Sequence, residues 1–130
     1  MTKILIVDDD PDILDLLRLE FEDDPTCHAD ITTDVVKALA LARKRQYEVI
    51  ITDWRMPVMN GTEFVYGLRR QGCTSFIIIY SGRELDQEIR DALDAGANEY
   101  ISRRGDPTSE FSELKEILKK GSAPVKSTAE

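Results

Sequence analysis

Short apolar runs that alternate with longer amphipathic stretches constrain the fold of this chain more than any other feature. Residues 4–7, 49–51 and 76–80 are apolar at successive positions. Such runs are typical of strands that are buried on both faces of a parallel sheet. Residues 29–32 and 99–102 are weaker strand candidates. Because an amphipathic stretch follows each run, the pattern predicts an α/β fold of five βα units, with a parallel five-stranded sheet between two layers of helices.

The amphipathic stretches predict which helical side chains face the core and where the helices begin and end. Asp10-Pro11 and Asp106-Pro107 each offer a helix N-cap followed by proline at the first helical position. Gly72 and Gly96 fall where a helix should stop. The residues expected to face the core are Ile13, Leu14, Leu16, Leu17 and Phe21, then Val35, Val36 and Leu39, then Phe64, Val65 and Leu68, then Leu85, Ile89, Ala92 and Leu93, and finally Phe111, Leu114, Ile117 and Leu118.

Length and charge limit the organisation of the chain and its partners. A chain of 130 residues suits one domain, which we expect over residues 1–120, and residues 121–130 have the composition of a flexible tail or linker. The net charge of −8 argues against nucleic-acid binding by this domain. Because no apolar run resembles a secretory signal or approaches membrane-spanning length, we expect a cytoplasmic protein without membrane contact. Whether the tail leads to another domain stays open.

Polar residues follow four of the five predicted strands. In an open α/β sheet, ligands bind at the carboxyl ends of the strands. Carboxylates, a hydroxyl and a cationic side chain should therefore share one edge of the sheet. The residues concerned are Asp8, Asp9 and Asp10 after the first strand, Thr52, Asp53 and Trp54 after the third, Ser81 and Gly82 after the fourth, and Ser102, Arg103 and Arg104 after the fifth.

Their residue types suit one chemistry. Crowded carboxylates raise one another's pKa unless a cation lies among them. Mg²⁺ prefers oxygen ligands and needs only one or two protein carboxylates beside phosphate oxygens. With a hydroxyl and a long cationic side chain added, such a site can hold a phosphoryl group while a carboxylate attacks it in line. The edge of the sheet is therefore suited to phosphorylation of one of its own aspartates.

Each residue also has a simpler interpretation. Asp10 alone favours a helix cap, and Asp8 and Asp9 are equally well explained as loop acids. Asp53 precedes a turn, and Ser81 beside a glycine suits a turn or a helix cap. The joint occurrence at strand ends is what favours the site.

Four segments resemble the receiver domain of response regulators in two-component signalling, in particular the chemotaxis receivers. They are ILIVDDDP at residues 4–11, DWRMPVMNG at 53–61, IIIYSG at 77–82 and AGANEYI at 95–101. The resemblance extends over residues 3–119. It implies a flavodoxin-like three-layer (βα)5 fold with strand order 2-1-3-4-5. It also implies a phosphorylation switch that catalyses only its own modification, with a histidine kinase or phosphotransfer protein as donor in a phosphorelay.

The resemblance assigns the metal site residue by residue. Asp53 is the phosphoacceptor. Asp9 binds Mg²⁺ directly, Asp8 binds it mainly through water, and the backbone carbonyl of Arg55 is a third protein ligand.

The resemblance also assigns the phosphoryl contacts and the switch. Ser81 contacts a phosphoryl oxygen, and Tyr100 is the aromatic residue that reorients when Ser81 moves; its simpler interpretation is a half-buried strand tyrosine with its hydroxyl in water. One departure concerns the fifth strand, where the family has lysine followed by proline and this chain has Arg103-Arg104. We expect a trans peptide there, because a cis bond before a non-proline residue costs about 2.5–4 kcal/mol.

The role of Arg103 stays open at this point. It is long enough to reach the phosphoryl oxygens, and we then expect slower transfer than with lysine, because an arginine fork differs from a point charge. Alternatively it pairs with Asp53 or Asp9 before phosphorylation and competes with Mg²⁺. A third alternative is that Arg103 and Arg104 both point into solvent.

Two other functions remain as alternatives. The first is a degenerate receiver that acts as a docking module independent of phosphorylation. The second is an aspartyl-phosphate phosphatase of the haloacid dehalogenase class, which ranks low because Asp8-Asp9-Asp10-Pro11 lacks the threonine or valine that should follow. The cognate kinase and the downstream effector cannot be named from the sequence, and weak homodimerisation is undecided.

Overall fold

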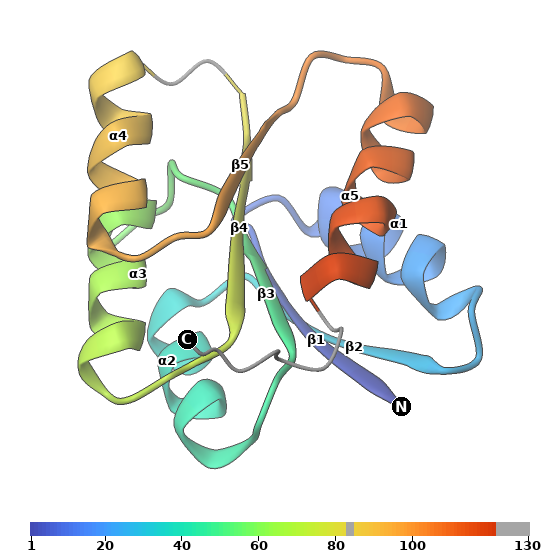
Figure 1. The fold of residues 1–130 in the computed structure, drawn as a ribbon, viewed down its shortest axis with the longest axis horizontal. Coiled ribbons are helices and arrows are strands. Elements are labelled where there is room, and N and C mark those ends of the chain that lie inside the picture. The colour runs from blue at the N-terminus through green and yellow to red at the C-terminus, as the bar shows by residue number, and fades with distance from the viewer. Residues whose placement is uncertain (83–84, 122–130) are drawn as a thin grey trace.

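A computed structural model describes residues 1–82 and 85–121 of the chain (Figure 1). Residues 122–130, which make up nearly all of the predicted tail, lie outside the described residues. No helix among the described residues is both long enough and apolar enough to cross a membrane. The elements in order are β1 (Thr2–Val7), α1 (Pro11–Glu22), β2 (Cys27–Thr32), α2 (Val35–Lys44), β3 (Val49–Thr52), α3 (Gly61–Arg70), β4 (Phe76–Ser81), α4 (Asp86–Ala95), β5 (Glu99–Ser102) and α5 (Pro107–Gly121).

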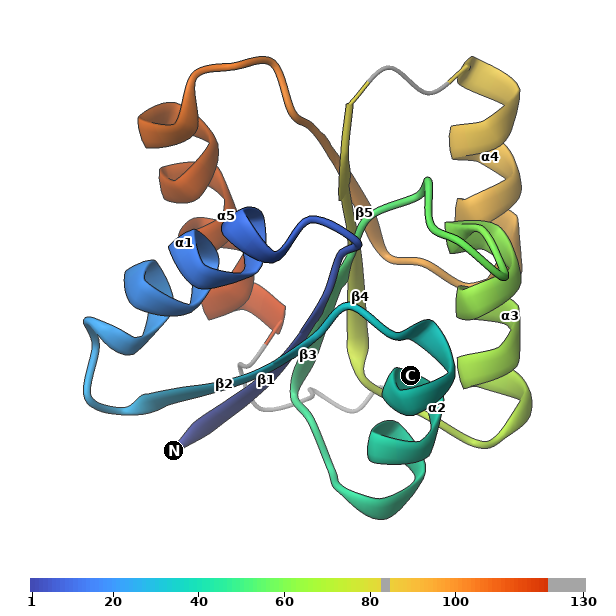
Figure 2. The ribbon, with the colours of Figure 1, turned by 180° about the vertical axis from the view of Figure 1, so that it is seen from behind.

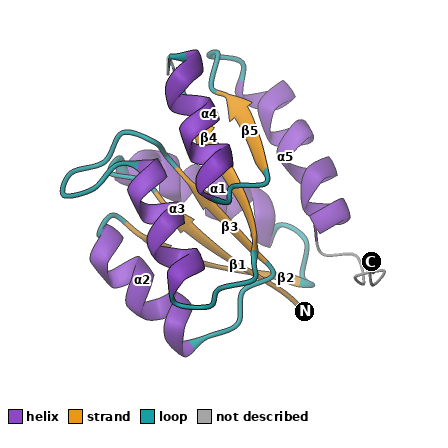
Figure 3. Cartoon of the chain, turned by 60° about the vertical axis from the view of Figure 1, so that its left-hand side comes forward, coloured by secondary structure: helices purple, strands orange, loops and turns teal. Residues whose placement is uncertain are grey.

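The five strands form one parallel sheet in the order β2-β1-β3-β4-β5. Helices α1 and α5 cover one face, and α2, α3 and α4 cover the other, which is clear from the front and the back of the molecule (Figures 1 and 2). The alternation of strands and helices along the chain is visible in Figure 3. The predicted flavodoxin-like three-layer fold and its strand order are therefore confirmed.

Both faces of the sheet are buried, which explains the continuous apolar runs. Ile4 and Ile6 of β1 pack into the core on the α1 and α5 side. Leu5 and Val7 of the same strand pack into the second core, beneath α2, α3 and α4. All four side chains are fully buried. A strand between two helical layers has no polar face, because successive side chains point to opposite sides.

The helical faces are narrower than the sequence predicts. Leu14, Leu17 and Phe21 of α1 are buried, as expected. The expectation was wrong for four other residues. Three of them lie in a helix but outside the stripe that points at the strands, and Leu85 precedes α4 as its N-cap residue. The four that stay exposed are Leu16, Val36, Leu85 and Leu93.

The predicted helix ends are confirmed. The Asp10 side chain caps α1 by accepting a hydrogen bond from the Asp12 amide at 2.9 Å, which supports the simpler interpretation of this aspartate. Gly96 follows the last residue of α4 with a φ of 127°, a conformation that glycine adopts without a side-chain clash.

Arg69 of α3 joins the loops at the amino-terminal ends of β4 and β5. Its Nε and Nη2 atoms donate to the Gly96 carbonyl at 3.1 and 2.9 Å, and Nη2 also donates to Asn98 Oδ1 at 3.0 Å. Its Nη1 atom donates to the carbonyls of Cys73 and Ser75, both at 2.9 Å. One side chain thus satisfies carbonyls from two separate connections, which a shorter or less branched cation would not reach together.

Substitution of Arg69 by methionine is expected to lower the free energy of unfolding by about 3 kcal/mol, because several partly buried acceptors lose their donors. Arg69→Lys should recover only part of this loss. Urea unfolding followed by circular dichroism measures the effect, with Arg70→Met on the exposed face of the same helix as the control. Equal midpoints for Arg69→Met and Arg70→Met would contradict the structural role of Arg69.

Candidate functional site

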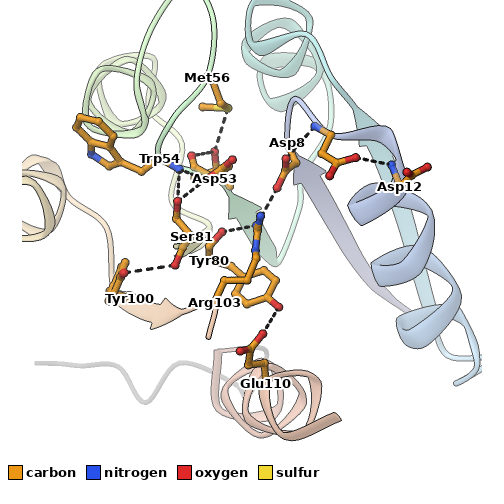
Figure 4. Close-up of polar contacts among 12 residues, drawn as sticks. Asp8, Asp12, Asp53, Trp54, Met56, Tyr80, Ser81, Tyr100, Arg103 and Glu110 are labelled. Carbon is orange, nitrogen blue, oxygen red and sulfur yellow. Dashed lines mark hydrogen bonds and ion pairs between the residues drawn. The ribbon is translucent and has the colours of Figure 1, made fainter. Parts of the chain in front are cut away.

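The carboxyl ends of β1, β3, β4 and β5 bring the predicted polar residues together. Asp8 and Asp9 follow β1, and Asp53 follows β3. One carboxylate oxygen from each of these three residues lies within 4.8 Å of the other two. Ser81, at the end of β4, and Arg103, after β5, reach the same place (Figure 4). The three carboxylates, the hydroxyl and the cation therefore share one edge of the sheet, as the topology predicts.

Asp8 is the most buried acid of the cluster, with 2% of its surface exposed. Its Oδ1 accepts a hydrogen bond from the Asp10 amide at 2.9 Å, and its Oδ2 accepts one from Arg103 at 2.8 Å. Burial raises the pKa of Asp8 to about 6, the Asp53 carboxylate adds to the rise, and the Asp10 amide and Arg103 oppose it. A buried carboxylate beside two others gains from a nearby cation, so the donor set fits a hard ion with oxygen ligands.

Asp53 has one carboxylate oxygen fixed by its neighbours. The residue is buried, and its amide donates to the Val7 carbonyl at 3.0 Å, which fixes the end of β3 against β1. Its Oδ1 accepts hydrogen bonds from the Trp54 amide, at 2.7 Å, and from the Ser81 hydroxyl. Within the described part of the chain, Oδ2 accepts no hydrogen bond. The carboxylate thus presents one oxygen that is held in place and one that is available.

Ser81 ends β4, and the hydroxyl of Tyr100, from the neighbouring strand β5, reaches this strand end. The Ser81 hydroxyl is buried, donates to Asp53 and accepts from the Trp54 amide at 3.2 Å. Tyr100 is half-buried, as expected. Its hydroxyl donates to the carbonyls of Ser81 at 3.3 Å and Gly82 at 3.2 Å, and this contact differs from a hydroxyl that meets only water. A movement of the β4 end would therefore reach Tyr100 through the backbone.

The loop after β3 folds back tightly over Trp54. The Gly61 amide donates to the Trp54 carbonyl at 2.7 Å, and a Cβ atom on Gly61 would lie 2.9 Å from Trp54 Cα, so glycine is required there. The indole Nε1 donates to the Thr62 hydroxyl at 3.0 Å, and the Arg55 guanidinium carbon lies 6.0 Å from the indole ring. Val58 has a φ of 78°, which costs a β-branched residue about 1–3 kcal/mol, so the surrounding contacts hold this loop in place.

Arg103 pairs with Asp8, and not with Asp53 or Asp9, the two partners that the sequence left open as an alternative. Its Nη2 atom donates to Asp8 Oδ2 and to the Tyr80 carbonyl, both at 2.8 Å. Its guanidinium carbon lies 4.5 Å from the centre of the Tyr80 ring. Burial alone would lower the pKa of Arg103, but the Asp8 carboxylate raises it above its ordinary value, so the side chain stays charged. Arg103 therefore places a cation beside the deepest carboxylate of the cluster.

The backbone after β5 explains this pairing. No cis peptide bond occurs in the described residues, so the Arg103–Arg104 bond is trans, as expected. Arg104 turns outward and pairs with Glu113 at 3.5 Å, so only Arg103 enters the site. Among the buried side-chain nitrogens and oxygens of the described residues, only Arg103 Nε has no hydrogen-bond partner. This atom is a buried donor without a partner among the described residues.

Two residues near the site, Tyr80 and Glu110, were missed as functional candidates. Tyr80 belongs to β4 and Glu110 to the first turn of α5, and they form a hydrogen bond of 2.6 Å across 30 residues of sequence. The only sequence signal is a tyrosine at the end of the apolar run 76–80, directly before the site serine. No spacing rule connects a strand residue with a helix residue so far away.

Comparisons with known proteins agree on one family. A sequence model of the response regulator receiver domain matches residues 4–118. The uncharacterized 14.6 kDa protein of the sodA1 3′ region of Leptolyngbya boryana is 32% identical over 106 residues, which cover 80% of each chain. The response regulator ArlR of Staphylococcus saprophyticus is 30% identical over 120 residues, but these cover only 54% of ArlR, so the chain spans about half its length. Response regulator protein TrrA of Thermotoga maritima, crystallised in complex with Mg²⁺-BeF, is 30% identical with a TM-score of 0.78, and the match covers 93% of this chain and 99% of TrrA.

Proposed function

Because the chain belongs to the response regulator receiver domain family, whose members are signalling domains rather than conventional enzymes, we propose that it is a phosphorylation switch with Asp53 as the acceptor. The observation that carries the proposal is the state of the Asp53 carboxylate. Ser81 and Trp54 hold Oδ1, whereas Oδ2 accepts no hydrogen bond from the described residues. A nucleophile held in this way is oriented for attack without being blocked.

The proposed step is a transfer of one phosphoryl group. Asp53 Oδ2 forms a new bond to phosphorus while the bond from phosphorus to the donor's leaving atom breaks, and the leaving atom keeps the electron pair. The Ser81 hydroxyl lies close enough to contact a phosphoryl oxygen once it leaves Asp53 Oδ1. The unpartnered Nε of Arg103 is a suitable donor to a second oxygen. The role of Tyr100 as a switch stays a prediction.

The residues present also fit Mg²⁺. Asp9 and Asp53 would supply carboxylate oxygens directly, and Asp8 would act mainly through water. The backbone carbonyl of Arg55 would supply a third protein ligand. Bound there, the ion would neutralise charge on the carboxylates and on the phosphoryl oxygens. Asp9 is exposed, which suits direct binding, whereas Asp8 lies deeper and is already paired with Arg103.

Mg²⁺ is expected to stabilise the fold by about 2.7 kcal/mol at a concentration near one hundred times its dissociation constant, because it binds the folded cluster and not the unfolded chain. Thermal unfolding with increasing MgCl2, against KCl at equal ionic strength, measures the gain. Asp9→Asn should lose most of it without a folding defect, since Asp9 is exposed. A wild-type melting temperature that does not respond to Mg²⁺ would argue against the site.

Trp54 offers an optical test of the proposed function. Its amide donates to Asp53, and it is the only tryptophan of the chain. Its emission is expected to change when Mg²⁺ binds and to change again when beryllofluoride, a phosphoryl mimic, is added. Asp53→Asn should lose the beryllofluoride response. If wild type and Asp53→Asn give the same spectra under every condition, the acceptor site is placed wrongly.

A histidine kinase or phosphotransfer protein is the donor we expect, in the cytoplasm, and the effector downstream is not specified by the site. A second candidate function is a docking module that works without phosphorylation. The observation in its favour is the Arg103–Asp8 pair, because a resident cation already neutralises the deepest carboxylate of the cluster. Under this alternative neither Mg²⁺ nor beryllofluoride alters Trp54 emission.

A further inference from the structure

Glu110 is a buried carboxylate that no step of the proposed phosphoryl transfer uses. Only 1% of its surface is exposed. Its Oε1 accepts a hydrogen bond from the Tyr80 hydroxyl at 2.6 Å, and its Oε2 accepts hydrogen bonds from the amides of Arg104 and, at 3.3 Å, Asp106. Burial alone would raise the pKa of Glu110, but these donors hold it below its ordinary value, so the group stays ionised. The buried charge therefore fixes the Tyr80 side chain and the backbone at Arg104 and Asp106, which supply the three donors.

Two of these groups, the Tyr80 ring and the Arg104 backbone, adjoin Arg103. The Tyr80 ring lies against the guanidinium, with its centre 4.5 Å from the guanidinium carbon (Figure 4). The Arg104 amide belongs to the peptide that directly follows Arg103. Glu110 therefore fixes both the ring that supports the charged end of Arg103 and the backbone from which its side chain starts. Asp8 holds the same guanidinium through its Nη2 atom.

Such support matters if a cation displaces Arg103 from Asp8. Within the described residues, the Arg103 side chain would then keep only its contacts with Tyr80, namely the ring and the carbonyl at 2.8 Å. An arginine side chain has several rotatable bonds and loses much conformational entropy when it is fixed. The Tyr80 ring, held by Glu110, keeps the guanidinium in the site, so less conformational entropy is lost when Arg103 binds the phosphoryl group.

We propose that Tyr80 and Glu110 are positioning residues that hold Arg103 in place for phosphoryl transfer to Asp53. The inference rests on the proposed function of Asp53 as acceptor. Neither residue touches the phosphoryl group, and both act through Arg103. The competing explanation is that the Tyr80–Glu110 hydrogen bond only fastens α5 to the sheet, which affects stability and nothing else.

A double-mutant cycle separates the two explanations. The rate of Asp53 phosphorylation by acetyl phosphate with Mg²⁺ is measured for Tyr80→Leu, Tyr80→Phe and Arg103→Ala, and for each Tyr80 substitution combined with Arg103→Ala. Tyr80→Leu is expected to slow the wild-type background about tenfold, because the cation–π support is lost. Tyr80→Phe, which keeps the ring but not its hydroxyl, should slow it less. In the Arg103→Ala background neither substitution should slow the reaction further.

Two controls separate an effect on the phosphorylation rate from an effect on stability. Leu114→Ala removes a buried α5 side chain of the same core and should lower stability without slowing phosphorylation. All rates are compared at a temperature where circular dichroism shows each variant folded. The affinity for beryllofluoride, measured from Trp54 emission, should likewise fall with Tyr80→Leu in the wild-type background. It should not fall further with Tyr80→Leu in the Arg103→Ala background.

The rates distinguish failure of the positioning role from failure of the proposed function. If Tyr80→Leu slows wild type and Arg103→Ala by the same factor, or slows neither, the positioning role is overturned while the proposed function stands. If the wild-type chain takes up no phosphoryl group, the proposed function and this inference fail together.

Discussion

Replacement of Asp53 by asparagine is expected to abolish phosphorylation of the chain and to leave its fold intact. An amide has nearly the same shape as a carboxylate, and its oxygen can still accept the hydrogen bonds from Trp54 and Ser81. It is not a competent nucleophile, so no phosphoryl group should be taken up. The change also removes one negative charge from a cluster of three acids, so the metal-free variant should be more stable than wild type by about 1 kcal/mol.

Intact-mass spectrometry after incubation with acetyl phosphate and Mg²⁺ measures the uptake, and thermal unfolding without metal measures the stability. Asp15→Asn serves as the matched control, because Asp15 is an exposed acid on α1. It should take up one phosphoryl group as wild type does. Uptake by Asp53→Asn at the wild-type rate would place the acceptor elsewhere.

Arg103→Ala is expected to slow phosphorylation about 100-fold, since a charged donor to the phosphoryl oxygens is lost. The sequence alone predicts faster transfer with lysine, but the contact between Arg103 and the Tyr80 ring reverses this expectation. Arg103→Lys should fall between alanine and wild type, because it keeps the charge but not the planar contact. Arg103→Ala also leaves Asp8 buried without its partner, so the metal-free protein should lose about 2 kcal/mol of stability.

Steady initial rates with a small-molecule donor, and urea unfolding in the presence of EDTA, measure the two effects of Arg103→Ala. Arg104→Ala is the control, because Arg104 pairs with Glu113 at the surface. If the alanine and lysine variants of Arg103 both match wild type in rate, Arg103 is not the cation of the site.

The fold could be predicted from sequence because a strand that is buried on both faces has apolar residues at successive positions. The side chains of Ile4, Leu5, Ile6 and Val7 are all buried, so the run is continuous, as is typical of a strand between two layers. The burial of helical side chains is harder to predict from the sequence. Val36 and Leu93 fit the apolar periodicity of their helices but are exposed, because periodicity defines a face and does not say how much of that face the sheet covers.

The acids and the serine of the site could be predicted because topology alone places them together. Parallel strands end at one edge, so Asp8, Asp53 and Ser81 had to converge once their strands were identified. The partner of Arg103 could not be predicted in the same way. It depends on the path of the chain after β5 and on which carboxylate is most buried, and the answer was Asp8. The contact between Tyr80 and Glu110 joins two elements without any sequence pattern.

Phosphorylation of the wild-type chain, with the modified residue identified, tests the central claim most directly. The protein is incubated with acetyl phosphate and Mg²⁺, any acyl phosphate is reduced with borohydride, and peptides are sequenced by mass spectrometry. The prediction is a single modified aspartate at Asp53, formed with Mg²⁺ and absent when EDTA replaces it. No modification, or modification at another acid while Asp53 stays unchanged, would contradict the assignment of this site as a phosphoacceptor.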